Sequence, residues 1–305
     1  MPLYPLTPSQ LNNVSVSDAL AFIKSPTLMA RRLSEILNAQ EFIGLSLLTG
    51  RYTMEGGVIA VPKNEVIRAD RSAETVAPGA EYKLTPLSKE QYDLYMASKR
   101  GLATEVTDEE VGRSKMRPIE DAAQFLKNEL LFDANSLALA AITSKVTATI
   151  AASAVWNTGT PGKVIIKDVL RAQAQAKMLK LGFNIDTVVL PADDYAVVMP
   201  EIFDFLQRGS GTMPDLLNVA WLSTSDANFT NPLLLDRQRL GGIGREDIPS
   251  PEYRQVPDLN GINIGIELAT IREPRADKTR LQARFPHVPV IVNPSAGLFI
   301  TGTGL

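Results

Sequence analysis

Residues 118–147 contain the feature that most constrains how this chain can fold, an apolar stripe at helical spacing. Its members recur at alternating intervals of four and three residues: Ile119, Ala123, Leu126, Leu130, Ala134, Leu137 and Ala141. This spacing places them on one face of a helix. Pro118 suits a first helical turn, and Lys145 lies where the helix dipole favours a cation. Such a helix would span about 45 Å at roughly 1.5 Å per residue. We therefore expect a spine across the protein, with 133–136 as the place where it could break.

The composition sets limits on fold and chemistry. The 305 residues are 45% hydrophobic, which is enough for a sizeable core and two domains. A net charge of −3 gives no basic field for nucleic acid or acidic lipid. The absence of cysteine excludes disulfides, thiolate metal sites and a cysteine nucleophile. No apolar run approaches the roughly 18 residues of a membrane span, and the first residues lack the pattern of a signal peptide. A reducing, cytoplasmic location is expected.

The N-terminal part is predicted to be an arm followed by a helix. Residues 1–15 carry proline at positions 2, 5 and 8, a spacing that favours extended structure, although a disordered tail would have the same composition. Ser25 and Pro26 can start a helix, and the apolar positions that follow have helical spacing, so we expect a helix at 26–39.

Residues 50–87 are punctuated by proline and glycine and have little to bury. Two short strands are expected, one in GGVIAVP and one in NEVIRAD. Loops of this length in compact domains are either functional or disordered. We expect a long two-stranded arm that pairs with a neighbouring subunit.

Residues 90–106 are predicted to form antiparallel strands joined by a turn at 99–101, because Tyr92, Leu94 and Met96 alternate with polar residues. Thr107 and Glu110 have the spacing of a capping box and open a short helix.

The second half has the pattern of an α/β layer, after a turn-rich boundary at 148–163. A helix at 164–181 ends at Gly182, which fits a left-handed position. A buried strand follows at 187–190, and a helix starts at 191–194. Residues 207–250 are looser, with Trp221 and Phe229 as anchors. Further strands are expected at 262–268, 279–285, 288–292 and 297–301.

No catalytic template is complete in this sequence. GTPGKV at 159–164 matches a phosphate loop only at Gly162 and Lys163, and the glycine pairs at 209–211 and 241–244 lack the third glycine of a dinucleotide fingerprint. His287 is the only histidine and lies between prolines. We predict a structural role for it, because a catalytic Ser-His-Asp triad is defined by the geometry of three residues and not by the presence of a histidine. Acidic clusters lie at helix starts, where the dipole explains them. We expect no catalytic residue, cofactor or metal.

The order of these segments resembles a known family. Residues 103–110 look like a strand leading into a short helix, 119–146 like a spine helix, 168–199 like a helix–glycine–strand–proline–helix block, and VNPSAGLFITG like a last strand. In this order they resemble major capsid proteins of tailed bacteriophages with the Hong Kong 97 fold. The resemblance implies an α+β fold with an N-arm at 1–49 and an E-loop hairpin at 50–88. It also implies a peripheral domain at 89–147 and 271–292 with its spine helix, and an α/β axial domain at 148–270 and 293–305.

The resemblance also implies a function: self-assembly as hexamers and pentamers into an icosahedral virion shell around double-stranded DNA, formed in the host cytoplasm. Its implied partners are a portal, a scaffold or protease, and a decoration protein. Candidate inter-subunit contacts are charged residues in the first third of the chain: Arg31, Arg32, Lys63, Arg68, Asp70, Arg71, Glu74 and Lys83. Lys63 and Lys83 lie in the segment where some relatives crosslink a lysine, without a specific acceptor.

Two other functions are also compatible with the sequence. An encapsulin is a shell of the same fold loaded with protein, and the contents of the particle would distinguish it. A soluble α/β hydrolase or transferase would need a convergent polar pocket and would lose activity in His287→Ala. The dipeptide Arg31-Arg32 is also explained by a solvated helix face.

Overall fold

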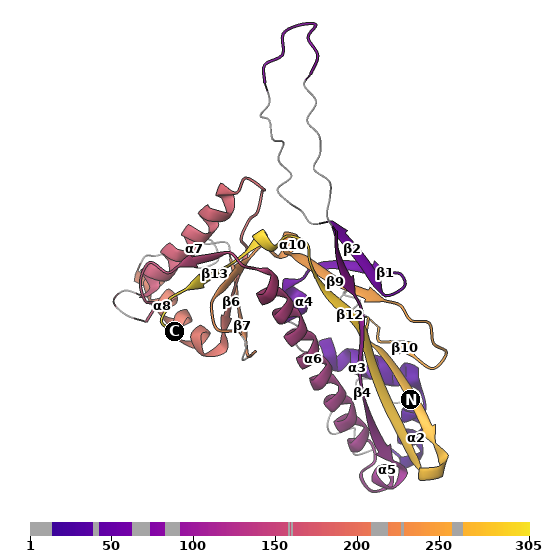
Figure 1. The fold of residues 1–305 in the computed structure, drawn as a ribbon. Helices are drawn as coiled ribbons and strands as arrows, with labels where there is room; N and C mark the ends of the chain where they lie inside the picture. The colour runs from indigo at the N-terminus through magenta and orange to yellow at the C-terminus, as the bar shows by residue number, and fades with distance from the viewer. Residues whose placement is uncertain are drawn as a thin grey trace.

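The structure is a computed structural model that describes residues 14–38, 43–62, 74–82, 92–157, 159, 161–208, 219–226, 229–257 and 265–305. Its central element is the helix α6 (Arg117–Lys145), 29 residues long and without the break that was considered at 133–136. Figure 1 shows α6 running from the lower end of the long sheet up to the second sheet. The predicted spine is therefore confirmed.

The buried face of α6 changes partner along its length. Residues from Ile119 to Ala134 pack in one hydrophobic cluster, whereas Ala138, Leu139 and Ile142 pack in a second. Leu137 and Ala141, which continue the predicted stripe, are only half-buried. A strict alternation of four and three averages 3.5 residues per turn and drifts across a helix of 3.6. The stripe was therefore predicted correctly in the first half of α6 and wrongly in the second.

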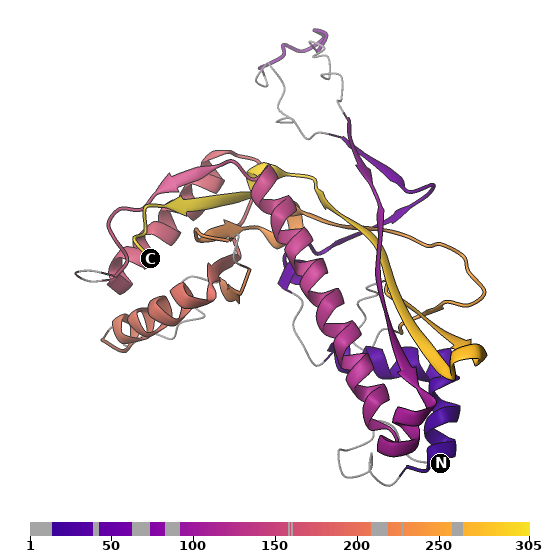
Figure 2. The same ribbon diagram turned by 60° about the horizontal axis from the view of Figure 1, so that its bottom comes forward.

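A long sheet packs against the first half of α6 (Figure 2). Its order is β1-β9-β12-β11-β10, and β4 also pairs with β12. The strands are β1 (Gly50–Met54), β4 (Ser98–Thr107), β9 (Gly241–Glu246), β10 (Arg254–Gln255), β11 (Glu267–Glu273) and β12 (Lys278–Ile291). The short helix α5 (Asp108–Ser114) follows β4 and has the predicted capping box between Thr107 and Glu110. The 3-10 turn η1 (Pro274–Ala276) joins β11 to β12.

Two predictions about this sheet are wrong. The turn at 99–101 does not form, since β4 is one strand paired with β12 from Ser98 to Thr107. A Cβ on Gly101 would lie 2.7 Å from the carbonyl oxygen of Ala283, so this glycine permits close approach of two strands. The predicted strands at 279–285 and 288–292 are one strand, β12. Pro286 lies in the gap between the part of β12 that pairs with β11 and the part that pairs with β9, and it is in register with Lys99 of β4 on the other edge.

Two helices near the N-terminus, α2 (Val16–Ile23) and α3 (Pro26–Asn38), pack in the cluster of the first half of α6, whereas the short helix α4 (Ile43–Leu47) packs in the second cluster through Leu47. Phe22 and Ile23 of α2 and Leu33 of α3 are buried in the cluster of the first half of α6. The helix predicted at 26–39 is confirmed as α3. Residues 16–37 of the expected arm are thus packed into the core, while residues 1–13 lie outside the described part.

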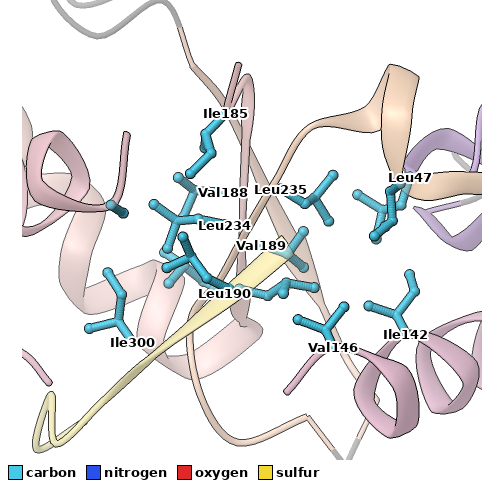
Figure 3. Packing of buried hydrophobic residues seen from close by; sticks show 14 of the residues in the cluster. Leu47, Ile142, Val146, Ile185, Val188, Val189, Leu190, Leu234, Leu235 and Ile300 are labelled. Atoms are coloured by element: carbon cyan, nitrogen blue, oxygen red, sulfur yellow. The ribbon is translucent and has the colours of Figure 1, made fainter. Parts of the chain in front are cut away.

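The second sheet has the order β5-β13-β8-β6-β7 and packs with α7 (Pro161–Met178) and α8 (Ala192–Arg208). Its strands are β5 (Thr149–Ala151), β6 (Thr187–Pro191), β7 (Ala220–Thr224), β8 (Leu233–Leu235) and β13 (Gly297–Thr301). Figure 3 shows Ile142 and Val146, at the end of α6, facing the side chains of β6 and β8. The helix–strand–helix block was predicted, and Gly182 has the expected positive φ of 76°.

Residues 229–257 are more regular than the sequence suggested. Besides β8, they form the helix α10 (Arg237–Leu240), β9 and β10, and η2 (Pro294–Ala296) precedes β13. Phe229 is buried as expected, whereas Trp221 is only partly buried. A Cβ on Gly242 would lie 2.2 Å from the carbonyl oxygen of Gly50, so the glycines of β9 admit β1 instead of marking a loop. Three strands from this part of the chain, β9, β10 and β11, lie in the long sheet together with β12.

A separate two-stranded ribbon consists of β2 (Val58–Pro62) and β3 (Tyr92–Met96), which pair antiparallel from Val58 with Met96 to Pro62 with Tyr92. Of the segment between these strands the structure describes residues 74–82, which lie apart from the two sheets in Figure 1. The first strand and the alternation of the second were predicted, but β3 pairs with β2 and not with β4. The strand expected in NEVIRAD lies outside the described residues.

Candidate inter-subunit surfaces

The inner face of the ribbon β2–β3 is fixed to the body of its own chain. The hydroxyl of Tyr95 donates a hydrogen bond of 2.9 Å to the carbonyl oxygen of Ile291 in β12. The ammonium of Lys145, at the end of α6, lies 3.2 Å from the carboxylate of Asp93 and 5.8 Å from the ring centroid of Tyr95. These contacts set the direction in which the ribbon leaves the body.

The outer face of the ribbon is apolar and exposed. Tyr92, Leu94 and Met96 alternate with the inward residues, and their exposed fractions are 57%, 69% and 72%. Val58, opposite Met96 on β2, is 39% exposed. Single exposed apolar residues are ordinary, but an adjacent set on one ribbon is typical of an interaction site. We call this set, Val58, Tyr92, Leu94 and Met96, the ribbon patch.

A second exposed apolar feature lies on the spine. Phe125 and Phe132 are 49% and 71% exposed, and because they are seven residues apart they share one face of α6. This pair faces away from the cluster that contains Leu126 and Leu130. Aromatic side chains are enriched in protein interfaces, since they bury much area at a low entropic cost.

Of the predicted contact residues, Arg31, Arg32 and Glu74 are described. Arg32 is used within its own chain: its guanidinium donates 2.9 Å hydrogen bonds to both carboxylate oxygens of Glu120 on α6 and contacts Glu35 at 3.1 Å. Arg31 and Glu74 are exposed. The other five lie outside the described residues: Lys63, Arg68, Asp70, Arg71 and Lys83. Sequence reasoning sought charged contacts and missed the ribbon patch, although its alternation is visible in the sequence.

Charged residues of the paired strands β4 and β12, which we call the ribbon β4–β12, and of the adjoining α5 and β11 form ion pairs with one another. Arg272 donates to both oxygens of Asp108 at 2.5 Å, and this contact lowers the pKa of the Asp108 carboxyl. The carboxylate of Glu105 accepts from Lys278 at 2.6 Å and from Arg280 at 2.7 Å, which lowers its pKa in the same way. The charged side chains named here therefore have their ion-pair partners within the same chain.

Buried polar residues in α7 and in the long sheet have structural roles. Asp168 in α7 is fully buried and accepts hydrogen bonds from the backbone of Ser153 and the indole of Trp156, which fix the chain before α7. The guanidinium of Arg284 lies 2.5 Å from the carboxylate of Glu267 on the neighbouring strand and 3.7 Å from the ring centroid of Tyr253.

The catalytic templates rejected from sequence have no counterpart in the described part of the chain. His287 is 2% exposed, and its ring stacks on Phe285 with centroids 3.7 Å apart. Burial lowers the pKa of its imidazole. Gly162 and Lys163 lie in the first turn of α7, and Gly241 to Gly244 lie in β9. Within the described ranges no group of acidic or histidine side chains could hold a metal ion, and no helix has the length and hydropathy to cross a membrane.

Comparison with solved structures gives the fold. The chain is similar to a virus-like particle from Pyrococcus furiosus, with 14% identity, a TM-score of 0.58, and coverage of 89% of this chain and 97% of that one. It is also similar to the capsid of the cyanophage P-SCSP1u, with 12% identity, a TM-score of 0.57, and coverage of 84% and 86%. The mature capsid of bacteriophage PhiM1 gives 12% identity, a TM-score of 0.54, and coverage of 87% and 88%.

Sequence comparison gives the family. No curated protein matches the chain. The model of a family described as phage capsid protein, however, matches residues 91–300, which include the spine, β3 and the two sheets except for β1 and the last residue of β13. The expected Hong Kong 97 fold and the expected structural, non-enzymatic role are thereby confirmed. The chain belongs to the phage capsid protein family.

Proposed function

We propose that the chain assembles as hexamers and pentamers into an icosahedral shell that encloses double-stranded DNA. The observation that carries this proposal is the ribbon β2–β3, whose inner face is fixed to its own chain while its outer face is apolar and exposed. A lone two-stranded ribbon is marginal in water. A neighbouring copy that covers the ribbon patch would stabilise both the ribbon and the assembly.

The spine supplies a matching surface for this contact. Phe125 and Phe132 of one copy would pack against the ribbon patch of the next, so each subunit gives one surface and receives the other. Fully burying a large apolar side chain contributes about 1.5–3 kcal/mol, and each contact recurs at every copy in the shell. Weak individual contacts are therefore sufficient for a stable particle.

The charge of the chain is consistent with confinement of DNA instead of tight binding. A net charge of −3 gives little counterion release, which is the main source of non-specific affinity for nucleic acid. Partners such as a portal, a scaffold or protease, and a decoration protein remain part of the proposal, as do the contacts expected from Arg31 and Glu74. The proposed domain division keeps the spine in the peripheral unit and places the strands β9, β10 and β11 there with it, because they share a sheet with β12.

Electron microscopy of the expressed protein tests whether shells form. Analysis of the particle contents tests whether the shell encloses DNA or protein. We expect closed particles that, when formed in the presence of double-stranded DNA and the packaging partners, protect this DNA from nuclease. A second candidate is a protein-cargo shell, because the chain is also similar to a particle that is described only as virus-like. Particles that co-purify with one protein and protect no DNA would support that candidate. Absence of particles under all assembly conditions would contradict both.

A further inference from the structure

The outer face of α7 combines cations with an apolar hollow. Lys163, Lys167 and Arg171 are exposed and follow at intervals of four, so they form one row. Arg171 is paired with the buried Asp168 at 3.2 Å. Neither lysine has an ion-pair partner within the described ranges. The row borders a shallow, mostly apolar hollow lined by Lys163, Ile166, Lys167, Leu170, Arg171 and Ala174. We call these residues the α7 face.

The outer face of α8 has the opposite charge and similar apolar content. Asp193, Val197, Pro200 and Asp204 are exposed and recur at helical intervals, so they form one stripe. Val197 is 45% exposed, and Phe203 beside the stripe is 52% exposed. Burial and the neighbouring negative charge of Asp193 raise the pKa of the Asp194 carboxyl. Asp193 and Asp194 both lie in the first turn of α8, so acidic side chains gather at this end of the helix. We call the stripe with Phe203 the α8 face.

The two faces match in length, charge and hydropathy. Both segments, Lys163 to Ala174 and Asp193 to Asp204, contain twelve residues, with about 16 Å of helix between their ends. Figure 1 places α7 and α8 at the same end of the molecule, away from the ribbon β4–β12. Two copies that met α7 to α7, or α8 to α8, would bring like charges together, whereas the mixed pairing brings opposite charges together over an apolar centre.

We propose that the α7 face of one subunit packs against the α8 face of a neighbouring copy. This contact rests on the proposed self-assembly, and it would be separate from that of the ribbon patch. A nucleic acid is the less favoured occupant, because phosphates would pair with Lys163 and Lys167 but leave the apolar hollow around Leu170 uncovered. The acidic α8 face would also repel a nucleic acid.

Charge reversal with mixing of subunits tests the contact. One variant carries Lys163→Glu and Lys167→Glu, and the other carries Asp193→Lys and Asp204→Lys. Each variant alone opposes like charges, so we expect its association to weaken about a hundredfold in sedimentation or native mass spectrometry, at roughly tenfold for each charge pair. An equimolar mixture restores opposite charges across the contact, so we expect association within about tenfold of the unaltered protein.

Two controls keep the result interpretable. Lys163→Arg with Lys167→Arg keeps the charges and should assemble normally. Circular dichroism establishes that each variant is folded, and Leu170→Ser with Val197→Ser replaces any variant that is not, with the expectation that this apolar pair also weakens association.

Rescue in the mixture can arise only from a contact between copies, so it would support the inference. Normal assembly of each charge-reversed variant would overturn it. Weakened association of each variant that the equimolar mixture does not restore would also overturn it. Normal particles that have lost only their DNA would overturn it as well and would assign the α7 face to nucleic acid. If the unaltered protein itself never assembles, the proposed function fails, and the inference fails with it.

Discussion

Two antiparallel strand pairs of this protein, the ribbon β4–β12 within the long sheet and the separate ribbon β2–β3, differ in what covers them. In β4–β12 the cross-strand charges pair with one another, as Glu105 does with Lys278 and Arg280, and α6 packs along the ribbon. In β2–β3 the inner face is fixed by Tyr95, while Leu94 and Met96 remain exposed. The ribbon β4–β12 is thus covered by its own chain, whereas one face of the ribbon β2–β3 is not. The difference indicates that β4–β12 stabilises the subunit and that β2–β3 serves the assembly.

The largest effect is expected from the ribbon patch. Leu94→Ser with Met96→Ser removes two apolar side chains that are already 69% and 72% exposed, so the free energy of unfolding of the subunit should change by only about 0.5 kcal/mol or less. Assembly should be lost, because the buried contact with a neighbour is lost. Urea denaturation and electron microscopy measure the two quantities, with Glu105→Gln on the other ribbon as the control. Normal shells from the double variant would remove the distinction between the ribbons.

The next effect concerns the sheet that contains the long ribbon. Glu267→Ala leaves Arg284, only 4% exposed, without its carboxylate, and breaking such a buried pair costs about 3–5 kcal/mol. Urea denaturation of the subunit measures the loss. Arg31→Ala, which changes an exposed cation, is the matched control and should leave stability nearly unchanged. Equal stability of Glu267→Ala and the unaltered protein would show that this pair is not needed.

A smaller effect is expected from Glu105→Gln. Its pKa is lowered by Lys278 and Arg280, so the folded state holds the carboxylate ionised at a pH where the unfolded chain takes up a proton. The stabilisation is present above the unfolded pKa and is lost as the pH falls through the folded pKa. Glu105→Gln should therefore lower the melting temperature slightly at neutral pH and show a shallower decline in acid. Parallel curves for the two proteins would contradict a role for these ion pairs in stability.

The smallest effect comes from His287, the only histidine of the chain. Burial lowers its pKa below the ordinary value of 6.5, so the unfolded state binds the proton more readily than the folded state. Stability should therefore fall as the pH drops through this value. His287→Gln cannot take up this proton, and its melting temperature should fall less between about pH 7 and about pH 5. An identical slope in the two proteins would place the pH dependence elsewhere.

Local signals in the sequence predicted much of the fold. Helices α3, α6 and α7, the capping box at Thr107 and the block from β6 to α8 follow from periodicity and capping residues, which act within one turn or strand. The errors concern long-range packing. Gly101 and Gly242 look like turn residues, but they lie in strands where another strand approaches too closely for a Cβ.

The functional surfaces were harder to predict for the same reason. The alternation of Tyr92, Leu94 and Met96 indicates a strand with one apolar face, but it does not tell which face the body covers. That depends on Tyr95 meeting β12, nearly two hundred residues later in the chain. Arg32 illustrates the converse, because its partner Glu120 lies on another helix and could not be inferred from sequence spacing.

The most direct test of the distinction between the ribbons is negative-stain electron microscopy of a variant that lacks residues 66–82, between β2 and β3. This deletion leaves both sheets, the spine and the ribbon β4–β12 intact. We expect a folded subunit with cooperative unfolding and no closed shells, next to abundant shells from the unaltered protein prepared in parallel. Closed shells of normal size from the shortened chain would contradict the assignment of β2–β3 and its extension to assembly.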